Sequence, residues 1–352
     1  MSYHRKGLPW SSGLGTNVKE CITAREVMQK ANLDWSVDKC ELVAKMPFRI
    51  GGFNEFDDDS FAHAGNIYRE CPNAYATYRT DTNMPLGIVK RKYEVVQNYD
   101  AFNFFDEAIG EDKAVWDYAG FFGLGHKVFV SAKLPVETTV GGDKIDNYLV
   151  FSNSHDGSSS INILFTPIRV ICTNCLNAAF HDADSYIRIR HTRTAKERLH
   201  RGAEVLRVAC EFAKTSQELY ESLTKVRMGD DAVKEYLAKL ILTEGEMKAI
   251  TDNYDLKIGL DKILYRDYMA MERTGISTRK ANKLAAMFEY YLTGIGQHHI
   301  LGTAWGAYNA VTGYYSNVDN KDGEARMESL LYGGGNNVML KALNDASVYK
   351  VA

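Results

Sequence analysis

A cluster of basic residues is the feature of this sequence that points most directly to chemistry. Between residues 188 and 207 the chain carries seven Lys and Arg against two acids, a local charge of +5 in a chain whose net charge is −3. If residues 185–191 form a strand, its period of two places Tyr186, Arg188 and Arg190 on one face. Arg193 continues the basic run. Such a face offers cations to phosphates and an aromatic ring to a base.

Two further segments repeat this combination. Residues 127–133 alternate as a half-buried strand does, which gives that strand one basic and aromatic face, and residues 90–92 are all basic. Grooves for single-stranded nucleic acid combine Lys or Arg along the phosphates with rings that stack on bases. A solvated sheet face is the alternative, and the residues alone leave it open. These segments add Lys90, Arg91, Lys92, Lys127, Phe129 and Lys133 to the predicted site.

A polar loop after the next predicted strand is a second candidate. It contains Asn153, Ser154, His155, Asp156 and Gly157. Backbone N–H groups and hydroxyls in such a loop can bind a phosphate. Alternatively, Asp-Gly supplies the backbone angles of a hairpin turn. An acid/base role for the His-Asp pair lacks a nucleophile and a third group.

Several kinds of enzyme find no support in the motifs. The chain has no P-loop, no dinucleotide-binding glycine pattern, no nucleophile elbow and no HExxH. Cys172 and Cys175 lack the partner ligands that a structural zinc needs, so we expect two buried core cysteines and no metal or cofactor. A Mg²⁺-dependent nuclease remains an alternative because it needs only one or two carboxylates. Its candidates are Asp146, Asp156, Asp182 and Asp184.

The composition is that of a folded protein without membrane segments. The 352 residues are 45% hydrophobic and 25% charged, and charged residues interrupt every apolar stretch. The six cysteines are few for this length, and residues 1–6 lack an apolar leader. We therefore expect a reduced, cytoplasmic location and no contact with a membrane.

The elements that must position these residues fall into two halves. All six prolines lie within the first 167 residues, which predicts a strand-rich domain at 1–193 and a helical region at 194–352, packed on the first. The expected fold class is α+β, an N-terminal antiparallel sheet with a helix packed across it, followed by a mainly helical half. Apolar spacing from Thr166 to Ala179 predicts that helix. Other strands are expected at 87–96, 147–153 and 161–165, and other helices at 194–226, from Thr243, from Ser277 and at 302–315.

Short motifs along nearly the whole chain resemble the phage/plasmid-like family of domain of unknown function. They are WSSGLGT at 10–16, ANLDW at 31–35, YRTD at 78–81, LGIV at 86–89, Tyr93 with VQN at 96–98, AF at 101–102, AKLP at 132–135, NSHDG at 153–157, PIRVIC at 167–172, IRHT at 189–192 and GTAW at 302–305. The resemblance implies a role in mobile-element biology. The expected architecture also resembles, more faintly and with no mapped residue, the RecT/Redβ/Erf superfamily of phage single-strand annealing proteins, which implies oligomeric rings or filaments.

These observations together predict an ATP-independent protein that binds single-stranded DNA and anneals strands in phage or plasmid recombination. Its work is binding, so we expect no enzyme activity, and we expect a homo-oligomer. The alternatives are a metal-dependent nuclease or nucleic-acid-modifying enzyme, and a mobile-element protein that binds a host factor.

Overall fold

An antiparallel sheet forms the centre of the molecule. The computed structural model describes residues 4–11, 13–47, 61–63, 66–109, 114–176, 186–195, 197 and 203–349. Within them a seven-stranded sheet runs in the order β1-β6-β7-β8-β9-β10, with β11 also paired to β9. Its strands are β1 (Gly15–Asn17), β6 (Val115–Phe122), β7 (Lys127–Val140), β8 (Asp143–Ser154), β9 (Ile161–Arg169), β10 (Asn174–Cys175) and β11 (Tyr186–Ile189).

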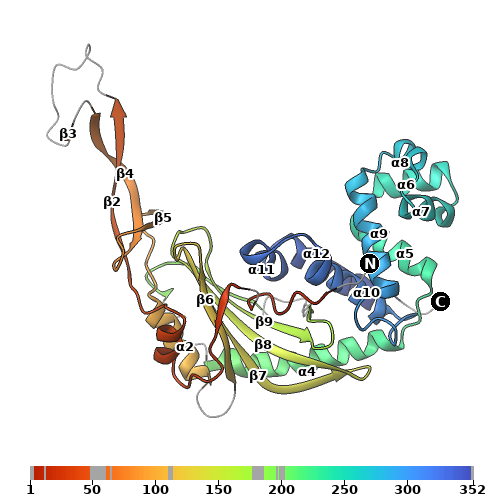
Figure 1. Ribbon diagram of the computed structural model, residues 1–352, viewed down its shortest axis with the longest axis horizontal. Helices are drawn as coiled ribbons and strands as arrows, with labels where there is room; N and C mark the ends of the chain where they lie inside the picture. Colours follow the sequence, from red (N-terminus) through yellow and green to blue (C-terminus); the bar gives the residue numbers. More distant parts are fainter. Residues whose placement is uncertain are drawn as a thin grey trace.

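Apolar side chains cover both faces of this sheet. In β7, Val128 and Val130 face one hydrophobic cluster, whereas Phe129 belongs to a second. Two short helices, α1 (Ala24–Lys30) and α2 (Asn98–Ile109), pack on the first face. The long helix α4 (Ala203–Lys225) crosses the sheet against β7 (Figure 1).

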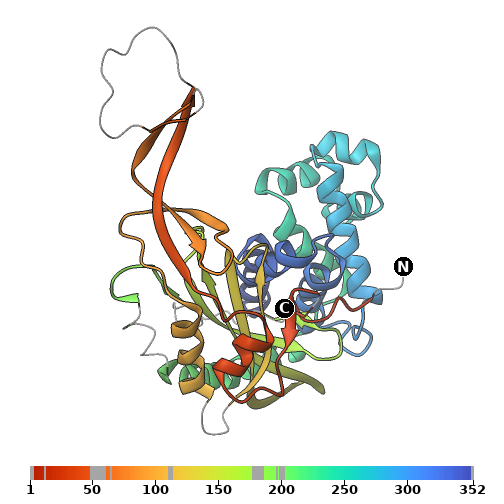
Figure 2. The same cartoon turned by 60° about the vertical axis from the view of Figure 1, so that its left-hand side comes forward.

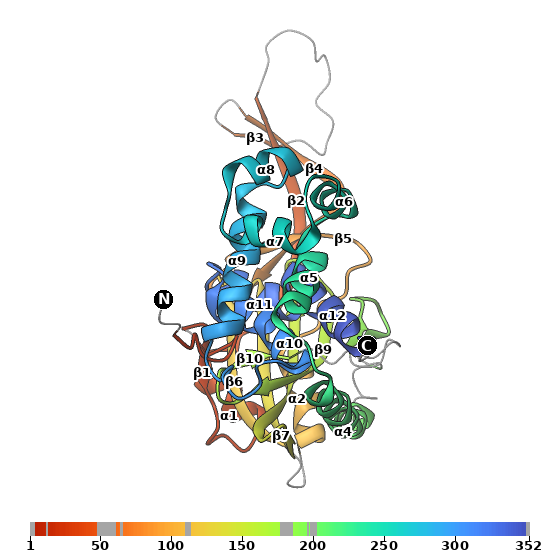
Figure 3. The same ribbon diagram turned by 90° about the vertical axis from the view of Figure 1, so that its right-hand side faces the viewer.

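The second face carries the C-terminal helices. These are α10 (Ala304–Gly313), the π-helical turn η2 (Tyr314–Val318), α11 (Gly323–Leu331) and α12 (Gly334–Ser347). All ten residues of α10 are buried, as its apolar sequence predicts. Beyond them a lobe of helices extends from the body, with α9 as its longest member (Figure 3). The lobe contains α5 (Asp230–Ile241), α6 (Glu244–Asn253), α7 (Leu256–Leu264), α8 (Tyr268–Thr274) and α9 (Thr278–Thr293).

A β-arm projects from the other side of the sheet (Figures 1 and 2). It consists of β2 (Val37–Pro47), β3 (Phe61–His63), β4 (Asn66–Arg79) and β5 (Pro85–Lys90). β5 brings the chain back against the β8–β9 hairpin. A Cβ atom at Gly87 would lie 2.5 Å from the backbone of Asp156, so only glycine allows this approach.

The α+β class and most expected elements are confirmed. The strands at 127–133, 147–153 and 161–165 occur within β7, β8 and β9, and β11 covers residues 186–189 of the strand expected at 185–191. Thr243 and Ser277 cap α6 and α9. The strand at 87–96 stops at Lys90. Of the helix expected at 194–226, residues 196 and 198–202 lie outside the described residues, and α4 begins at Ala203. Among the described residues, no helix combines the length and apolar character needed to cross a bilayer.

The helix expected at 166–179 is wrong over residues 166–176, and residues 177–179 lie outside the described residues. β9 continues through Pro167 to Arg169, and a turn with Thr173 at φ 54° leads back into β10. Every residue of β9 is buried. A strand buried on both faces has a nearly continuous apolar sequence, and over a short segment that sequence also matches helical spacing. The helix that crosses the sheet is α4 instead.

Candidate nucleic-acid interface

Two basic segments about a hundred residues apart in sequence lie side by side in the fold. The Glu94 amide donates a hydrogen bond to the His191 carbonyl at 3.2 Å. The Tyr93 ring stacks on the His191 ring, with the centroids 4.5 Å apart. These contacts bring the turn after β5 to the segment that follows β11. We call the six basic residues of this region the basic edge: Lys90, Arg91, Lys92, Arg188, Arg190 and Arg193.

The charges of the basic edge are uncompensated. All six side chains belong to exposed residues, and none forms an ion pair within the described part of the chain. Arginine presents a planar fork of donors that fits phosphate oxygens, and Lys90 and Lys92 add mobile point charges. The cluster therefore provides a positive surface in a protein whose net charge is −3.

Arg188 connects the basic edge to a groove of about 580 Å³ between the sheet and the α11–α12 pair. In β11, Ile187 and Ile189 alternate with Arg188, and Arg188 is paired with Asn162 of β9. Ile189 is buried in the cluster beneath α1 and α2, so Arg188 faces the opposite side of the sheet. The groove is lined by Lys127, Ser152, Asn162, Arg188, Tyr332 and Asn336, among others.

Polar groups line the floor and one wall of this groove. The Ser152 and Tyr332 hydroxyls lie 2.9 Å apart, and the Asn162 amide donates to Ser152 Oγ at 3.4 Å. Lys127 forms ion pairs with Glu328 and Glu324. Desolvation acts to lower the pKa of Lys127, but these carboxylates outweigh it and the pKa is raised. Lys127 is thus a compensated cation, and Arg188 supplies the free charge.

The start of α12 also lies at the groove. Residues 333–337 read GGGNN, a composition typical of a turn or a flexible segment. Instead, Gly333 is the N-cap of α12 and no side chain caps the helix, while Gly333 and Asn336 line the groove. Uncapped N–H groups and the positive end of the helix dipole favour anions near this point. A polar glycine-rich segment followed by the apolar periodicity of 338–346 is the signal that could have indicated it.

Other predicted residues lie away from the basic edge. Phe129 is fully buried and stacks on Phe122, so it cannot offer a ring to a base. As the strand period predicts, Phe129 lies on the opposite face of β7 from Val128 and Val130. The C-terminal helices cover that face. Lys133 pairs with Asp146 at 2.8 Å, six residues along β7 from Lys127. The strand position of Tyr186 is described, whereas its side chain lies outside the described residues.

The candidate loop at 153–157 consists of the last two residues of β8 and the first three of the β8–β9 hairpin turn. Gly157 has φ 75°, and the Ser158 amide donates to Asp156 Oδ1 at 2.9 Å. Asn153, Ser154 and His155 are buried. Asn153 donates to the Val96 carbonyl, Ser154 donates to Asp156, and His155 Nε2 bonds to Asn98 Oδ1. Asn153 Oδ1 and His155 Nδ1 have no hydrogen-bond partner, but both atoms are buried. The loop is therefore not an open phosphate-binding site.

A metal-dependent reaction gains no support from the described carboxylates. Asp146 is paired with Lys133, and Asp156 accepts hydrogen bonds from Ser154 and Ser158. Asp182 and Asp184 lie outside the described residues. Within the described ranges, no group of three or more His, Cys, Asp or Glu side chains could hold a metal ion. Cys172 and Cys175 are buried thiols, and burial raises the pKa of Cys175 to about 12.

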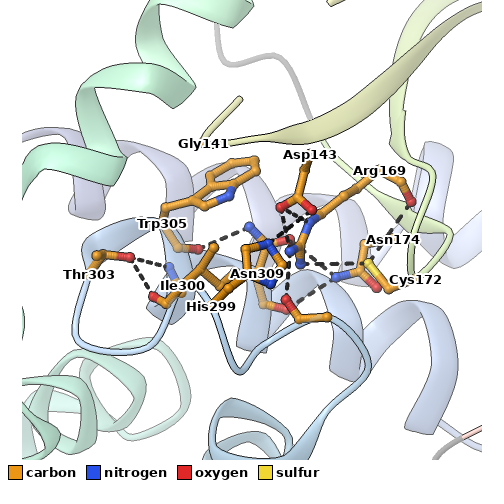
Figure 4. A network of polar contacts seen from close by, with 12 residues as sticks. Gly141, Asp143, Arg169, Cys172, Asn174, His299, Ile300, Thr303, Trp305 and Asn309 are labelled. Atoms are coloured by element: carbon orange, nitrogen blue, oxygen red, sulfur yellow. Dashed lines mark hydrogen bonds and ion pairs between the residues drawn. The ribbon is translucent and has the colours of Figure 1, made fainter. Parts of the chain in front are cut away.

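A buried polar network fixes the C-terminal helices to the sheet beside this region (Figure 4). Arg169 is fully buried, and its Nε and Nη2 donate to Asp143 Oδ2 at 2.8 and 2.5 Å. Its remaining donors reach Asn309 Oδ1 and the Gly296 carbonyl, and His299 Nε2 lies 3.1 Å from Asp143 Oδ1. Because every partner is internal, the network holds the two layers together and offers no open donor to a ligand.

The π-helical turn η2 extends the same network. Ser316 Oγ accepts from the Cys175 amide at 3.0 Å, and Asn317 Nδ2 donates to Asn174 Oδ1 at 3.0 Å. Asn174 also donates to Asn309 in α10. Strand β10 is therefore hydrogen-bonded both to α10 and to η2.

The chain belongs to the family described as Domain of unknown function (DUF932), whose profile matches residues 85–332. That range contains the basic edge and most of the groove. No curated protein matches the chain, and no solved structure does. The expected membership in a family of unknown function is confirmed, whereas the resemblance to the RecT/Redβ/Erf superfamily finds no support in these matches.

Proposed function

We propose that the protein binds single-stranded DNA along the basic edge and the adjoining groove, and that it promotes annealing of complementary strands without ATP. The observation that carries the proposal is the meeting of residues 90–92 with residues 188–193, joined through the Tyr93–His191 and Glu94–His191 contacts. Two separate segments thus supply one row of free cations. The chemistry is that of a phosphate-tracking surface.

The groove gives this surface a place for bases. A strand whose phosphates follow the basic edge would enter the groove at Arg188. Amide and hydroxyl groups of Asn162, Ser152 and Tyr332 lie on its walls and can bond to base edges. Recognition of unpaired bases by such groups requires that the strand be single, because a duplex hides the edges used for pairing.

Annealing needs neither nucleotide hydrolysis nor a metal ion, only binding that leaves bases able to pair. We propose that several copies act together as a homo-oligomeric ring or filament, so that a long strand is bound at intervals. The resemblance to phage- and plasmid-borne proteins favours a role in recombination of such elements in the cytoplasm. Sedimentation with and without DNA tests the assembly.

The double variant Arg188→Ala/Arg190→Ala should weaken binding of labelled oligo(dT) while leaving the fold intact, because both side chains are exposed. Each phosphate contact contributes about 0.7 to the slope of log K against log salt for a single strand, so the pair should reduce the slope by about 1.4. Fluorescence anisotropy over a salt titration in EDTA measures this. Annealing of complementary oligonucleotides without ATP should slow in parallel.

The matched control is Lys144→Ala/Lys257→Ala, which removes the same charge from exposed lysines that are paired with Glu137 and Asp231. We expect its salt slope to equal that of the parent. If the arginine variant keeps the parental affinity and slope, the basic edge is only a solvated surface and the proposal fails. Cleavage of the strand on adding Mg²⁺ would support the nuclease alternative, and absence of binding by the parent would support a host-factor partner.

A further inference from the structure

The helical lobe contains a helix–turn–helix whose turn is defined residue by residue. Helix α8 ends at Gly275, which has φ 69°. The Ile276 amide donates back to the Met271 carbonyl at 3.1 Å, and Ser277 then caps α9 by accepting from the Lys280 amide. Two helices joined by a three-residue turn with a left-handed glycine are the core of one class of DNA-binding unit.

Burial in this unit separates an inner from an outer face. Ala270 and Thr274 of α8, Ile276 of the turn, and Ala281 and Leu284 of α9 are buried. The apolar members of this set belong to one hydrophobic cluster, in which α8 packs on α6 and α7 while α9 packs on α5 and α7. The first turns of α9 are left at the free end of the lobe, next to α8 (Figure 3).

The outer face of α9 carries exposed polar side chains. Thr278, Arg279 and Asn282 are exposed. Arg266 Nε donates to Asn282 Oδ1 at 2.6 Å, which fixes the orientation of that amide. Arg273 of α8 is also exposed, and neither it nor Arg279 forms an ion pair with any described residue. In α8, Tyr268 is 69% exposed and adds a hydroxyl.

We propose that α8 and α9 dock on duplex DNA, with the N-terminal part of α9 in the major groove. An α-helix fits the width of that groove, arginine pairs with guanine O6 and N7, and asparagine pairs with adenine N6 and N7. Arg279 and Asn282 then contact base edges, while Arg266, Arg273 and Tyr268 lie toward phosphates. The choice of duplex DNA rests on this charge complementarity and on the exposed polar face of a single helix.

This site goes beyond the proposed single-strand function and is separate from it. In Figure 1 the lobe lies on the opposite side of the sheet from β5, whose end carries Lys90. One chain could therefore hold a duplex by the lobe and a single strand by the basic edge. Failure of either site leaves the other testable.

The test uses a pool of duplexes with about 20 randomised base pairs, selected on the full-length protein and sequenced. The parent should enrich a motif containing guanine and adenine, and anisotropy with the enriched duplex should show about tenfold or greater loss of affinity for Arg279→Ala/Asn282→Ala. Binding of oligo(dT) by that variant should not change. Arg188→Ala/Arg190→Ala should show the reverse pattern.

The control variant Lys248→Ala/Asn253→Ala removes one exposed lysine and one exposed asparagine from α6 of the same lobe. It should select the parental motif with parental affinity. Thermal unfolding of each variant verifies that the lobe is folded. Absence of any enriched motif with the parent, or an unchanged motif with Arg279→Ala/Asn282→Ala, would overturn the proposal.

Discussion

Replacing Arg169 by methionine should lower the free energy of unfolding by about 3–5 kcal/mol. Methionine is similar in length, so the change removes the charge with little loss of volume. It leaves the Asp143 carboxylate buried and without its main partner, and a buried unpaired charge costs far more than a lost surface contact. Urea denaturation followed by fluorescence measures the effect, since four tryptophans are present.

Two comparisons make this prediction specific. Asp143→Asn in the Arg169→Met background removes the unpaired charge and should recover part of the lost free energy. Lys144→Ala breaks the exposed Lys144–Glu137 pair next to Asp143 and should cost far less, because solvent screens an exposed ion pair. A loss for Arg169→Met no larger than that of Lys144→Ala would show that the buried network contributes little to the junction of sheet and helices.

Acidification should destabilise the protein well above the pH at which its carboxylates titrate. Burial lowers the pKa of His155 to about 3, and burial is also the main cause of the lowered pKa of His191. Both imidazoles titrate near 6.5 in the unfolded chain. Their stabilisation is complete above pH 6.5 and is lost as the pH falls toward the folded-state value, because the unfolded state binds protons first.

The expected slope is up to about 1.4 kcal/mol per pH unit for each histidine. Burial favours the neutral forms, and hydrogen bonds fix their tautomers, since His155 Nε2 donates to Asn98 Oδ1 and His191 Nδ1 donates to the Glu94 carbonyl. The free energy of unfolding measured from pH 7 to 4.5 should fall less steeply in His155→Gln. His298→Gln changes an exposed histidine and should keep the parental slope. Equal slopes for the two variants would contradict the assignment.

The sequence predicted well those elements whose residues show a clear strand alternation or a clear helix start. The sequence of β7 alternates over residues 127–133, and α6 and α9 begin directly after the capping residues Thr243 and Ser277. It failed at residues 166–176, where burial on both faces removes the alternation that marks a strand. The alternation of residues along a strand does not show which helices cover each face of the sheet. For this reason Phe129 was expected at the surface, whereas it is buried.

The sequence predicted the separate basic segments of the candidate site, whereas their contact with each other is known only from the fold. Each basic segment was recognisable from its composition, but the contact between residues 93–94 and His191 depends on how β5 returns from the arm. The groove needed α11 and α12 to be placed over β8 and β9, which no local spacing specifies. The helix–turn–helix has a weak signal in the sequence, because α8 has only seven residues and its turn is marked by a single glycine.

The π-helical turn η2 also limits how the length of this chain can change during evolution. A π turn closes over one residue more than an α turn, so the side chains after it are rotated relative to a regular continuation of α10. That rotation is what allows Asn317 as well as Asn309 to reach Asn174. Deleting one residue from Tyr314–Val318 would give a regular helix without breaking the chain, yet it would withdraw Asn317 from β10. Relatives that differ here by one residue should therefore carry a compensating change at the position of Asn174.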